Sequence, residues 1–237
     1  MHRFYIPSLD LTTDTVSIVD PHRVHQIARV LRMRPGELLS VFDGRGEERE
    51  IKILEVTSHQ VLGQRLERLI RRTEPSVQVS LYQAIPKKTA LFEWVVEKAT
   101  ELGVSAIYPL ITERTEKRRM SKFERLERIA IESTEQCNRL RVPLIHHPIS
   151  FETAFLQAKN GYLAYEFEEG MDLLDYGKAL MTGNALQLFI GPEGGFSQKE
   201  VNAAKKAGIK IYSLGSRILR TETAAIASLS QLLPLIR

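Results

Sequence analysis

The segments from residue 77 onward constrain the fold most, because β-type and helix-type patterns alternate there. Short apolar runs that are typical of strands cover residues 77–84, 106–111, 162–165, 186–190 and 209–214. Amphipathic segments that are typical of helices cover residues 90–102, 122–138, 152–158, 198–207 and 223–236. Strands that alternate with helices form a mostly parallel sheet with the helices on its faces. We therefore expect an α/β domain over residues 73–237.

The ends of several predicted helices carry local signals. Two helices begin with the Ser-x-x-Glu spacing of a capping box, at Ser121/Glu124 and Ser197/Glu200. Two helices are followed by a glycine, Gly103 and Gly208, which accepts the left-handed conformation that often ends a helix. These signals support the predicted positions of the helices.

The first 72 residues have a different, mostly β pattern. Asp20 and Pro21 are suited to the N-cap and first position of a helix, which we expect to end at Pro35-Gly36. Strand-like runs follow at residues 37–42, 48–56 and 61–66, and Asp43-Gly44 predicts a tight hairpin turn. Short strands with tight turns suggest a small β-barrel. Polar residues 67–76 interrupt the pattern, so we expect two domains, 1–72 and 73–237.

The composition excludes several classes of protein. Among 237 residues there is one cysteine, Cys137, which rules out an internal disulfide framework and favours a reducing cytoplasm. No run approaches 18 consecutive apolar residues, and the N-terminus lacks an apolar signal-peptide core, so we expect no membrane span. Six scattered histidines with a single cysteine have no ligand-like spacing, and we expect no metal site.

Two loops near the C-terminus are the best candidates for binding a ligand. The first, Gly191-Pro192-Glu193-Gly194-Gly195, follows a predicted strand and leads into a capped helix. The second runs from Leu214 to Thr223, again between a strand and a helix, and contains Gly215, Ile218 and Leu219. Open α/β sheets bind ligands at the carboxyl ends of their strands, so we expect both loops to border one pocket. Neither loop has the phosphate-binding or dinucleotide-binding glycine pattern. Glycine-rich turns without a ligand remain the alternative.

Positive charge is concentrated in the segment from Arg114 to Arg128. It holds seven basic residues against three acidic ones, an excess equal to the net charge of +4 of the whole chain. Such a segment can neutralise phosphates of a nucleic acid, although a solvated helix face is the simpler alternative. Glu135-Gln136 and Arg139 follow it, and Arg139 could bind a phosphate, stack on a base or neutralise the end of a helix.

Four segments together resemble the RsmE-type 16S rRNA (uracil-N3)-methyltransferases of the SPOUT superfamily. They are Glu97-Lys98-Ala99-Thr100-Glu101-Leu102-Gly103-Val104, Glu135-Gln136 with Arg139, Gly191 to Ser197, and Leu214-Gly215 through Arg220-Thr221-Glu222-Thr223-Ala224. The opening His2-Arg3-Phe4 and the segment Val30-Leu31-Arg32-Met33 also look like that family. The motifs occur in the expected order over essentially the whole chain.

The resemblance implies a fold and an activity that the periodicity does not show. Residues 1–72 would form a PUA-like β-barrel that binds RNA, and residues 73–237 a SPOUT domain with a deep trefoil knot. The chain would be a cytoplasmic homodimer that binds S-adenosyl-L-methionine. It would methylate N3 of a uridine in the 16S rRNA of the small ribosomal subunit.

The resemblance also assigns site residues. The cofactor would contact Leu110, Ile190, Gly191, Pro192, Glu193, Gly194, Gly195, Leu214, Gly215, Ile218, Leu219, Arg220, Thr223 and Ala224. RNA would contact Arg3, Arg32, Arg114, Lys117, Arg118, Arg119 and Arg139. As catalytic candidates, Arg220 or Arg139 would stabilise negative charge on the uracil, and Glu222 would accept its proton or orient Arg220.

Three alternative functions remain open on the sequence. The chain could be a non-catalytic RNA-binding protein whose pocket no longer binds a cofactor. It could be an enzyme of the same superfamily that modifies another RNA, such as tRNA or 23S rRNA. It could also be a metabolic α/β enzyme with a small acidic substrate, in which case the basic segment would have no role.

Overall fold

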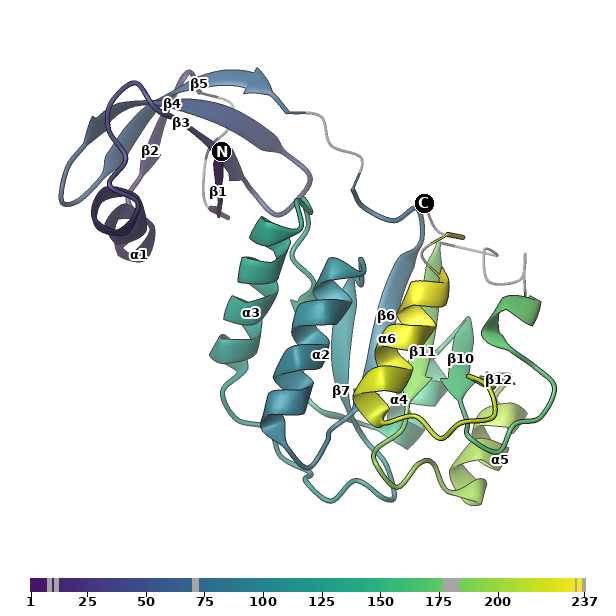
Figure 1. Ribbon diagram of the computed structural model, residues 1–237. Coiled ribbons are helices and arrows are strands. Elements are labelled where there is room, and N and C mark those ends of the chain that lie inside the picture. The colour runs from purple at the N-terminus through teal and green to yellow at the C-terminus, as the bar shows by residue number, and fades with distance from the viewer. Residues whose placement is uncertain (8–9, 11–12, 70–72, 177–183, 233, 236–237) are drawn as a thin grey trace. The chain divides into compact units, whose positions relative to one another are not determined.

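The computed structural model describes residues 1–7, 10, 13–69, 73–176, 184–232 and 234–235. The described chain forms two compact units, shown in Figure 1. Unit 1 comprises Met1–Thr73 together with Thr134–Val142, and unit 2 comprises Glu74–Ser133 and Pro143–Arg237. The predicted boundary between residues 72 and 73 adjoins residues 70–72, which lie outside the described residues.

Unit 1 is built on a mixed five-stranded sheet in the order β1-β3-β4-β5-β2. Its strands are β1 (His2–Tyr5), β2 (Thr15–Ile18), β3 (Leu38–Phe42), β4 (Glu48–Val56) and β5 (Val61–Arg68). β1 pairs with β3 in parallel, and the other pairs are antiparallel. Apolar residues of all five strands form one core with Val24 and Ile27 of the helical segment. β1 and β2 were not expected from the sequence.

The helical segment of unit 1 begins as predicted but ends early. The Asp20 carboxylate accepts a hydrogen bond from the backbone N–H of Arg23 over 2.8 Å, and Pro21 is the first residue of α1 (Pro21–His25). A π-helical turn, η1 (Gln26–Val30), follows directly. Arg32 then takes φ 53°, a left-handed conformation that ends the helix before Pro35. The expected end at Pro35-Gly36 is therefore wrong.

The hairpin that joins β3 and β4 forms with a longer loop than predicted. Phe42 pairs with Glu48, which leaves a loop of five residues, 43–47, in place of a tight two-residue turn. The Asp43 carboxylate accepts hydrogen bonds from the backbone N–H groups of Arg45 (2.7 Å) and Glu47 (3.1 Å). The aspartate thus stabilises the loop through its side chain.

The segment Thr134–Val142 belongs to unit 1 although it is remote in sequence. Arg3 forms an ion pair with Glu48 over 2.9 Å and also donates to the carbonyl oxygens of Thr134 and Arg139. The Glu135 carboxylate accepts from the backbone N–H of Tyr5 over 2.7 Å. It also pairs with Arg23 over 2.6 Å. These bonds of Arg3 and Glu135 therefore hold the segment Thr134–Val142 against β1.

The described part of unit 2 forms a seven-stranded sheet in which neighbouring strands pair in parallel. The main path runs β12-β10-β11-β6-β7-β8, and β9 also pairs with β7. The strands are β6 (Gln78–Ala84), β7 (Ala106–Ile111), β8 (Leu144–Ile145), β9 (Ile149–Ser150), β10 (Gly161–Ala164), β11 (Ala185–Ile190) and β12 (Lys210–Tyr212). The predicted parallel α/β architecture is confirmed. The short strands β8 and β9 were not expected.

In the described residues, the helices beside the sheet of unit 2 are α2 (Thr89–Glu101), α3 (Phe123–Gln136), α4 (Phe151–Gln157), α5 (Gln198–Lys206) and α6 (Thr221–Leu232). α2 and α6 lie side by side on one face (Figure 1). α4 and α5 pack on the opposite face, where Phe151, Ala154, Val201 and Ala204 share a core with the sheet. No helix in the described part of the chain has the length and apolar character of a membrane span.

Several predicted helix ends agree with the structure, and two do not. The capping box of Ser197 and Glu200 is formed, and Gly103 (φ 89°) and Gly208 (φ 85°) are left-handed. Lys122, however, takes φ 67°, so α3 begins at Phe123 and Ser121 does not directly precede the helix. The helix predicted to end at residue 236 ends at Leu232, and residues 233, 236 and 237 lie outside the described residues.

Candidate functional site

Three loops follow neighbouring parallel strands of unit 2 and border one cavity. They are the β10 loop (residues 165–170), the β11 loop (191–197) and the β12 loop (213–220), which leads into α6. β10 lies between β11 and β12 in the sheet. The carboxyl ends of parallel strands share one edge, and this brings the three loops together.

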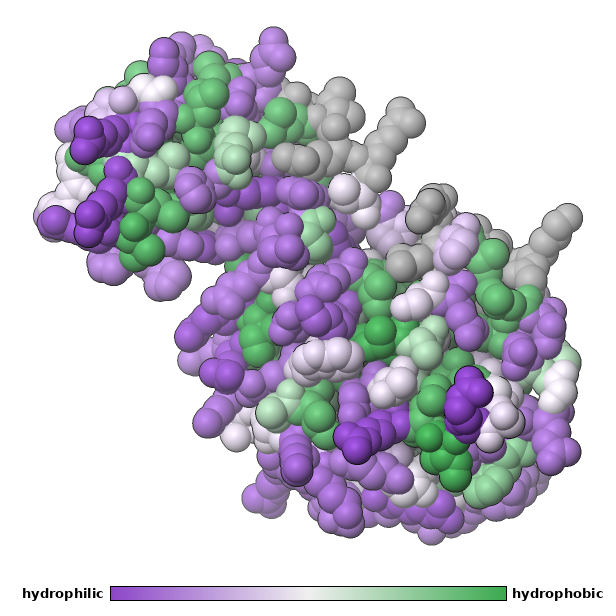
Figure 2. All heavy atoms as spheres, in the orientation of Figure 1, coloured by the Kyte–Doolittle hydropathy of each residue, from purple (hydrophilic) through white to green (hydrophobic). Residues whose placement is uncertain are grey.

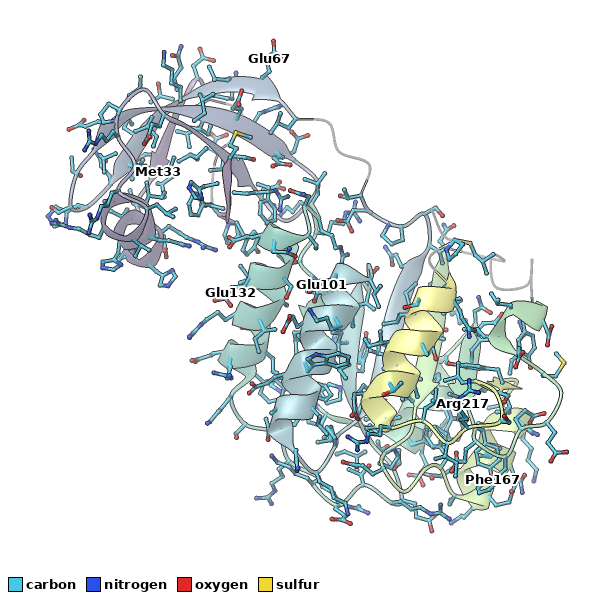
Figure 3. The ribbon with its side chains drawn as sticks, viewed as in Figure 1. Met33, Glu67, Glu101, Glu132, Phe167 and Arg217 are labelled. Atoms are coloured by element: carbon cyan, nitrogen blue, oxygen red, sulfur yellow. The ribbon has the colours of Figure 1, made fainter. Side chains whose placement is uncertain are left out.

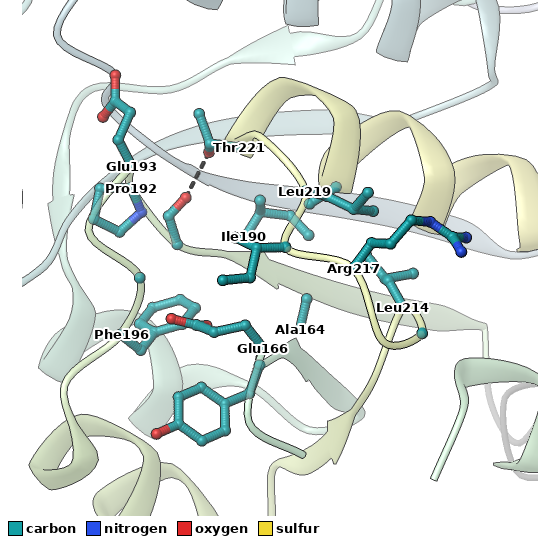
Figure 4. Close-up of a pocket in the computed structure, with 16 residues that line it drawn as sticks. Ala164, Glu166, Ile190, Pro192, Glu193, Phe196, Leu214, Arg217, Leu219 and Thr221 are labelled. Atoms are coloured by element: carbon teal, nitrogen blue, oxygen red, sulfur yellow. Dashed lines mark hydrogen bonds between the residues drawn. The ribbon is translucent and has the colours of Figure 1, made fainter. Parts of the chain in front are cut away.

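A hydrogen-bonded chain through Thr221 connects the β11 loop to the start of α6. The Thr221 hydroxyl donates to the carbonyl oxygen of Gly191 over 2.5 Å, as Figure 4 shows. It accepts from Nε2 of Gln83, at the end of β6, over 2.8 Å. Gln83 and Thr221 are both buried. The start of α6 is therefore anchored to two strands of the sheet.

The cavity encloses about 590 Å³, including space open to solvent. Its walls combine apolar side chains with glycine backbone and only three charged side chains. The lining residues are Ala164, Tyr165, Glu166, Ile190, Gly191, Pro192, Glu193, Gly195, Phe196, Leu214, Gly215, Arg217, Ile218, Leu219, Thr221 and Ala224.

Ten of the fourteen residues predicted to contact a cofactor line this cavity: Ile190, Gly191, Pro192, Glu193, Gly195, Leu214, Gly215, Ile218, Leu219 and Ala224. Leu110, Gly194, Arg220 and Thr223 are not among the lining residues. Leu110 is fully buried in the core beneath α4 and α5. The carbonyl oxygen of Gly194 accepts a hydrogen bond from Arg114 over 2.6 Å.

The β10 loop is the wall that the sequence reasoning missed. We expected Leu110 among the residues around the cofactor, whereas Ala164, Tyr165 and Glu166 line the cavity and Leu110 does not. The sequence around Glu166 has no glycine-rich pattern to mark it. The strand order provides the signal, because β10 separates β11 from β12. Phe196, Arg217 and Thr221 were also missed, although each adjoins a predicted residue.

Glycine is required at position 195. Its φ of 66° is a conformation that residues with side chains rarely adopt, and a Cβ there would overlap the carboxylate of Glu166. Figure 4 shows the Glu166 side chain beside the Phe196 ring, among the lining residues. The absence of a side chain at Gly195 thus leaves room for the Glu166 carboxylate in the cavity.

The loop after β7 supports the β11 loop from outside the cavity. The Glu113 carboxylate accepts from the Ser197 hydroxyl over 2.7 Å, and the Glu113 N–H donates to Glu200 over 2.8 Å. Lys87 donates its backbone N–H to the Glu193 carboxylate over 2.9 Å. These bonds hold both ends of the β11 loop before any ligand arrives.

The predicted basic segment is exposed but partly engaged. Arg114 donates to Gly194, and Lys117 donates to Thr89 over 2.6 Å. Arg118 borders a second hollow, between the ends of β7 and the starts of α4 and α5, and Arg119 is exposed to solvent. Of the four residues of this segment that were predicted to contact RNA, Arg118 and Arg119 have no hydrogen bond or ion pair in the described structure.

The predicted RNA contacts of unit 1 differ in accessibility. Arg32 is exposed. Arg3 is occupied by Glu48 and two carbonyl groups, and its side chain is 6% exposed. Arg139 is 3% exposed and is not a lining residue of the cavity. Arg3 and Arg139 are therefore buried within unit 1, and their contact with RNA stays a prediction.

The catalytic candidates Arg220 and Glu222 lie where the β12 loop enters α6. The carbonyl oxygen of Arg220 accepts from the backbone N–H of Ala224 over 2.8 Å, which is the first hydrogen bond of the helix. Arg220 is exposed, and its neighbours Leu219 and Thr221 both line the cavity. Arg220 and Glu222 form no ion pair with each other in the described structure.

Tyr82 and Glu135, which do not line the cavity, are among the groups with shifted pKa values. Burial, with Tyr108 alongside, raises the pKa of Tyr82 to about 12, so Tyr82 is a neutral core residue at physiological pH. Burial also raises the pKa of Glu135, and the Tyr5 N–H and Arg23 act against that shift. Among the described residues, no group of three or more His, Cys, Asp or Glu side chains could hold a metal ion.

The chain is similar to known RNA methyltransferases along its whole length. Residues 73–233 match the family model of an RNA methyltransferase domain, and residues 19–64 match that of an RNA methyltransferase PUA domain. Ribosomal RNA small subunit methyltransferase E from Rickettsia conorii is 31% identical over 97% of this chain and 94% of that protein. The protein of that name from Bacillus subtilis is 31% identical over 87% of this chain and 85% of its own.

Solved structures show the same likeness. The crystal structure of a ribosomal RNA small subunit methyltransferase E from Neisseria gonorrhoeae, bound to S-adenosyl methionine, has a TM-score of 0.89 and 30% identity, and the match covers 100% of this chain and 98% of that one. A putative methyltransferase from Legionella pneumophila, in complex with the bound cofactor, has a TM-score of 0.86 and 32% identity, with 98% and 97% coverage.

Proposed function

The chain belongs to the RNA methyltransferase family that includes ribosomal RNA small subunit methyltransferase E, and from this membership we propose its reaction and its site. It transfers a methyl group from S-adenosyl-L-methionine to N3 of a uridine in 16S rRNA. The observation that carries this proposal is the cavity at the carboxyl ends of β10, β11 and β12, whose loops are fixed to one another before a ligand binds.

The residues present fit the cofactor. The cavity offers apolar side chains for a flat ring, including Ile190, Leu214 and Leu219. Gly191, Gly195 and Gly215 leave backbone groups open to polar parts of a ligand. Nothing lies within 4 Å of where a Cβ on Gly215 would be, so this wall is open to an incoming molecule. These three loops would hold the cofactor.

Bound S-adenosyl-L-methionine supplies an electrophilic methyl group on a sulfonium sulfur. Uridine N3 becomes nucleophilic as its proton leaves, and negative charge then develops on the uracil oxygens. Arg220 is our candidate to stabilise that charge, because it remains cationic and lies between two cavity-lining residues with its side chain exposed. The new N3–methyl bond forms as the sulfur–methyl bond breaks.

Glu222 is our candidate to accept the N3 proton. It is half-buried in the first turn of α6, two residues from Arg220. An alternative role, in which Glu222 orients Arg220 through an ion pair, has no supporting contact among the described residues.

RNA binding is assigned to exposed cations in both units. In unit 2 these are Arg118 and Arg119, with Arg114 and Lys117 contributing charge alongside their intramolecular bonds. In unit 1, Arg32 is the exposed member of the predicted set. Such contacts position the RNA backbone without reading its sequence.

The family also suggests an assembly, a chain topology and a location. We propose that two copies form a homodimer in the cytoplasm, and that residues 73–237 contain a deep trefoil knot. Apolar side chains beside the cavity stay exposed in the single chain, with Ile218 at 82% and Phe167 at 68%. Figure 2 shows hydrophobic side chains gathered over the loop that enters α6. An exposed apolar patch of this kind favours a protein interface.

Isothermal titration calorimetry of the full-length protein tests the cofactor assignment. We expect one S-adenosyl-L-methionine to bind per chain with micromolar or tighter affinity. ATP is the matched control, because it shares the adenosine but lacks the sulfonium and the amino acid, and we expect it to bind at least a hundredfold more weakly. Equal binding of both ligands, or no heat with either, would contradict the assignment.

A further inference from the structure

The β10 loop places one carboxylate, that of Glu166, in the cavity without a cationic partner among the described residues. Of the three charged side chains that line the cavity, Glu193 is held by the N–H of Lys87. The side chains of Glu193 and Arg217 extend away from the other lining residues in Figure 4. Of these three charged side chains, that of Glu166 points toward the other lining residues. It forms no hydrogen bond or ion pair with the part of the chain that the structure describes.

An acidic hollow adjoins the cavity on this side. It is lined by Glu166, Phe167, Glu168, Glu169, Gly170, Asp172, Asp175, Ser213, Gly215 and Ser216, and it shares Glu166 and Gly215 with the cavity. The lining contains five carboxylates and no basic side chain. Lys205 pairs with Glu168 over 3.2 Å and offsets one of these charges. Figure 3 shows Phe167 and Arg217 extending from loops at this end of unit 2.

The position of Glu166 is built into the fold. The carboxylate occupies the space that a side chain at position 195 would need, and Gly195 has a left-handed backbone. Tyr165, the preceding residue, is fixed to the neighbouring strand by its N–H, which donates to the carbonyl oxygen of Tyr212 over 3.0 Å. Glu166 is exposed where it lines the cavity, so its negative charge is accessible to a cationic ligand that enters from solvent.

The cofactor and its product differ in charge at one atom. When the methyl group leaves, the electron pair of its bond stays on sulfur, and the cationic sulfonium becomes a neutral thioether. We propose that the Glu166 carboxylate makes the cavity selective for the charged cofactor over the neutral product, S-adenosylhomocysteine. This inference rests on the proposed function. It assigns to Glu166 the role of favouring cofactor binding and product release.

Calorimetry on the full-length protein and its variants tests the inference, with S-adenosylmethionine and S-adenosylhomocysteine as the two ligands. Glu166→Gln keeps the size of the side chain and removes its charge. We expect the affinity for S-adenosylmethionine to fall about tenfold and the affinity for S-adenosylhomocysteine to change less than twofold. Sinefungin, which carries an amine in place of the sulfonium, should follow S-adenosylmethionine.

Glu169→Gln is the matched control. Glu169 lines the acidic hollow but not the cavity, and we expect this variant to change the ratio of the two affinities less than twofold. Equal weakening of both ligands in Glu166→Gln would overturn the inference, because it would indicate a contact with the parts that the two molecules share. An unchanged ratio would overturn it as well. Failure of the unmodified protein to bind S-adenosylmethionine would instead contradict the proposed function.

Discussion

The hydroxyl of Thr221 donates to the carbonyl oxygen of Gly191 over 2.5 Å and so joins the β11 loop to the first residue of α6. The bond connects residues thirty positions apart in the chain. Thr221 also accepts from Gln83, whose Nε2 has a second partner in the carbonyl oxygen of Ala84 at 3.1 Å. The cavity between the loops depends on this connection, and the first prediction follows from it.

Thr221→Val keeps the shape of the side chain but removes the hydroxyl. An unsatisfied buried polar group costs on the order of 1–3 kcal/mol, so we expect lower stability and at least a tenfold weaker affinity for S-adenosylmethionine. Urea unfolding and calorimetry measure the two effects. Thr223→Val, at an exposed position two residues along the same helix, is the control and should change neither. Normal affinity in Thr221→Val would show that the bond does not shape the cavity.

Gly195→Ala should abolish most cofactor binding while leaving the fold intact. The added methyl group would meet the Glu166 carboxylate, and the left-handed backbone at Gly195 disfavours any side chain. Gly194→Ala is a close control, because a Cβ there meets only Arg114 at an ordinary 3.5 Å. Binding of S-adenosylmethionine measures the difference. Similar losses in both variants would mean that loop flexibility, rather than space in the cavity, governs the affinity.

Arg220→Ala should separate cofactor binding from turnover. Arg220 is exposed and does not line the cavity, so we expect the affinity for S-adenosylmethionine to stay within a few-fold of normal. If Arg220 stabilises charge on the uracil, single-turnover methylation should fall by about a hundredfold or more, as with loss of an oxyanion-hole donor. Near-normal turnover would remove Arg220 from the catalytic residues. Arg217→Ala is measured in the same two assays, of cofactor affinity and of turnover, for comparison with a residue that lines the cavity.

Charge reversal at Arg118 and Arg119 should weaken RNA binding and make it less dependent on salt. Each phosphate contact that is lost lowers the slope of log affinity against log salt by about one. Filter binding of a 16S rRNA fragment between 50 and 200 mM salt, about a fourfold range, measures the slope. The salt slope of a variant with the charge reversed at Arg128, an exposed position on α3, is measured for comparison. A slope equal to that of the unmodified protein would assign Arg118 and Arg119 to solvated surface.

The sequence predicts best the features that depend on neighbouring residues. The Ser197 capping box, the left-handed glycines at positions 103 and 208 and most strand positions in unit 2 follow from local spacing. The ends of the unit 1 helix and of α3 were misplaced because Arg32 and Lys122 adopt left-handed conformations, which are uncommon for residues other than glycine.

Features that depend on contacts between distant segments could not be read from local patterns. Glu166 enters the cavity because β10 lies between β11 and β12, an order that the sequence does not state. The motif Glu135-Gln136 with Arg139 had no structural role assigned from its sequence. In the structure, the Glu135 carboxylate accepts from the Tyr5 N–H and pairs with Arg23, and Arg139 is buried within unit 1. These partners of Glu135 lie more than a hundred residues away in the chain, so local patterns could not indicate them.

The central claim is that this cavity serves methylation of N3 of a uridine in small-subunit rRNA. The most direct measurement incubates the protein with S-adenosylmethionine carrying a labelled methyl group and with small ribosomal subunits that lack the modification, then identifies the labelled nucleoside by mass spectrometry. We predict label in N3-methyluridine at one position of 16S rRNA, and much less label when Gly195→Ala replaces the unmodified protein. Label in a different nucleoside, in tRNA or in 23S rRNA alone, or in no RNA at all, would contradict the claim.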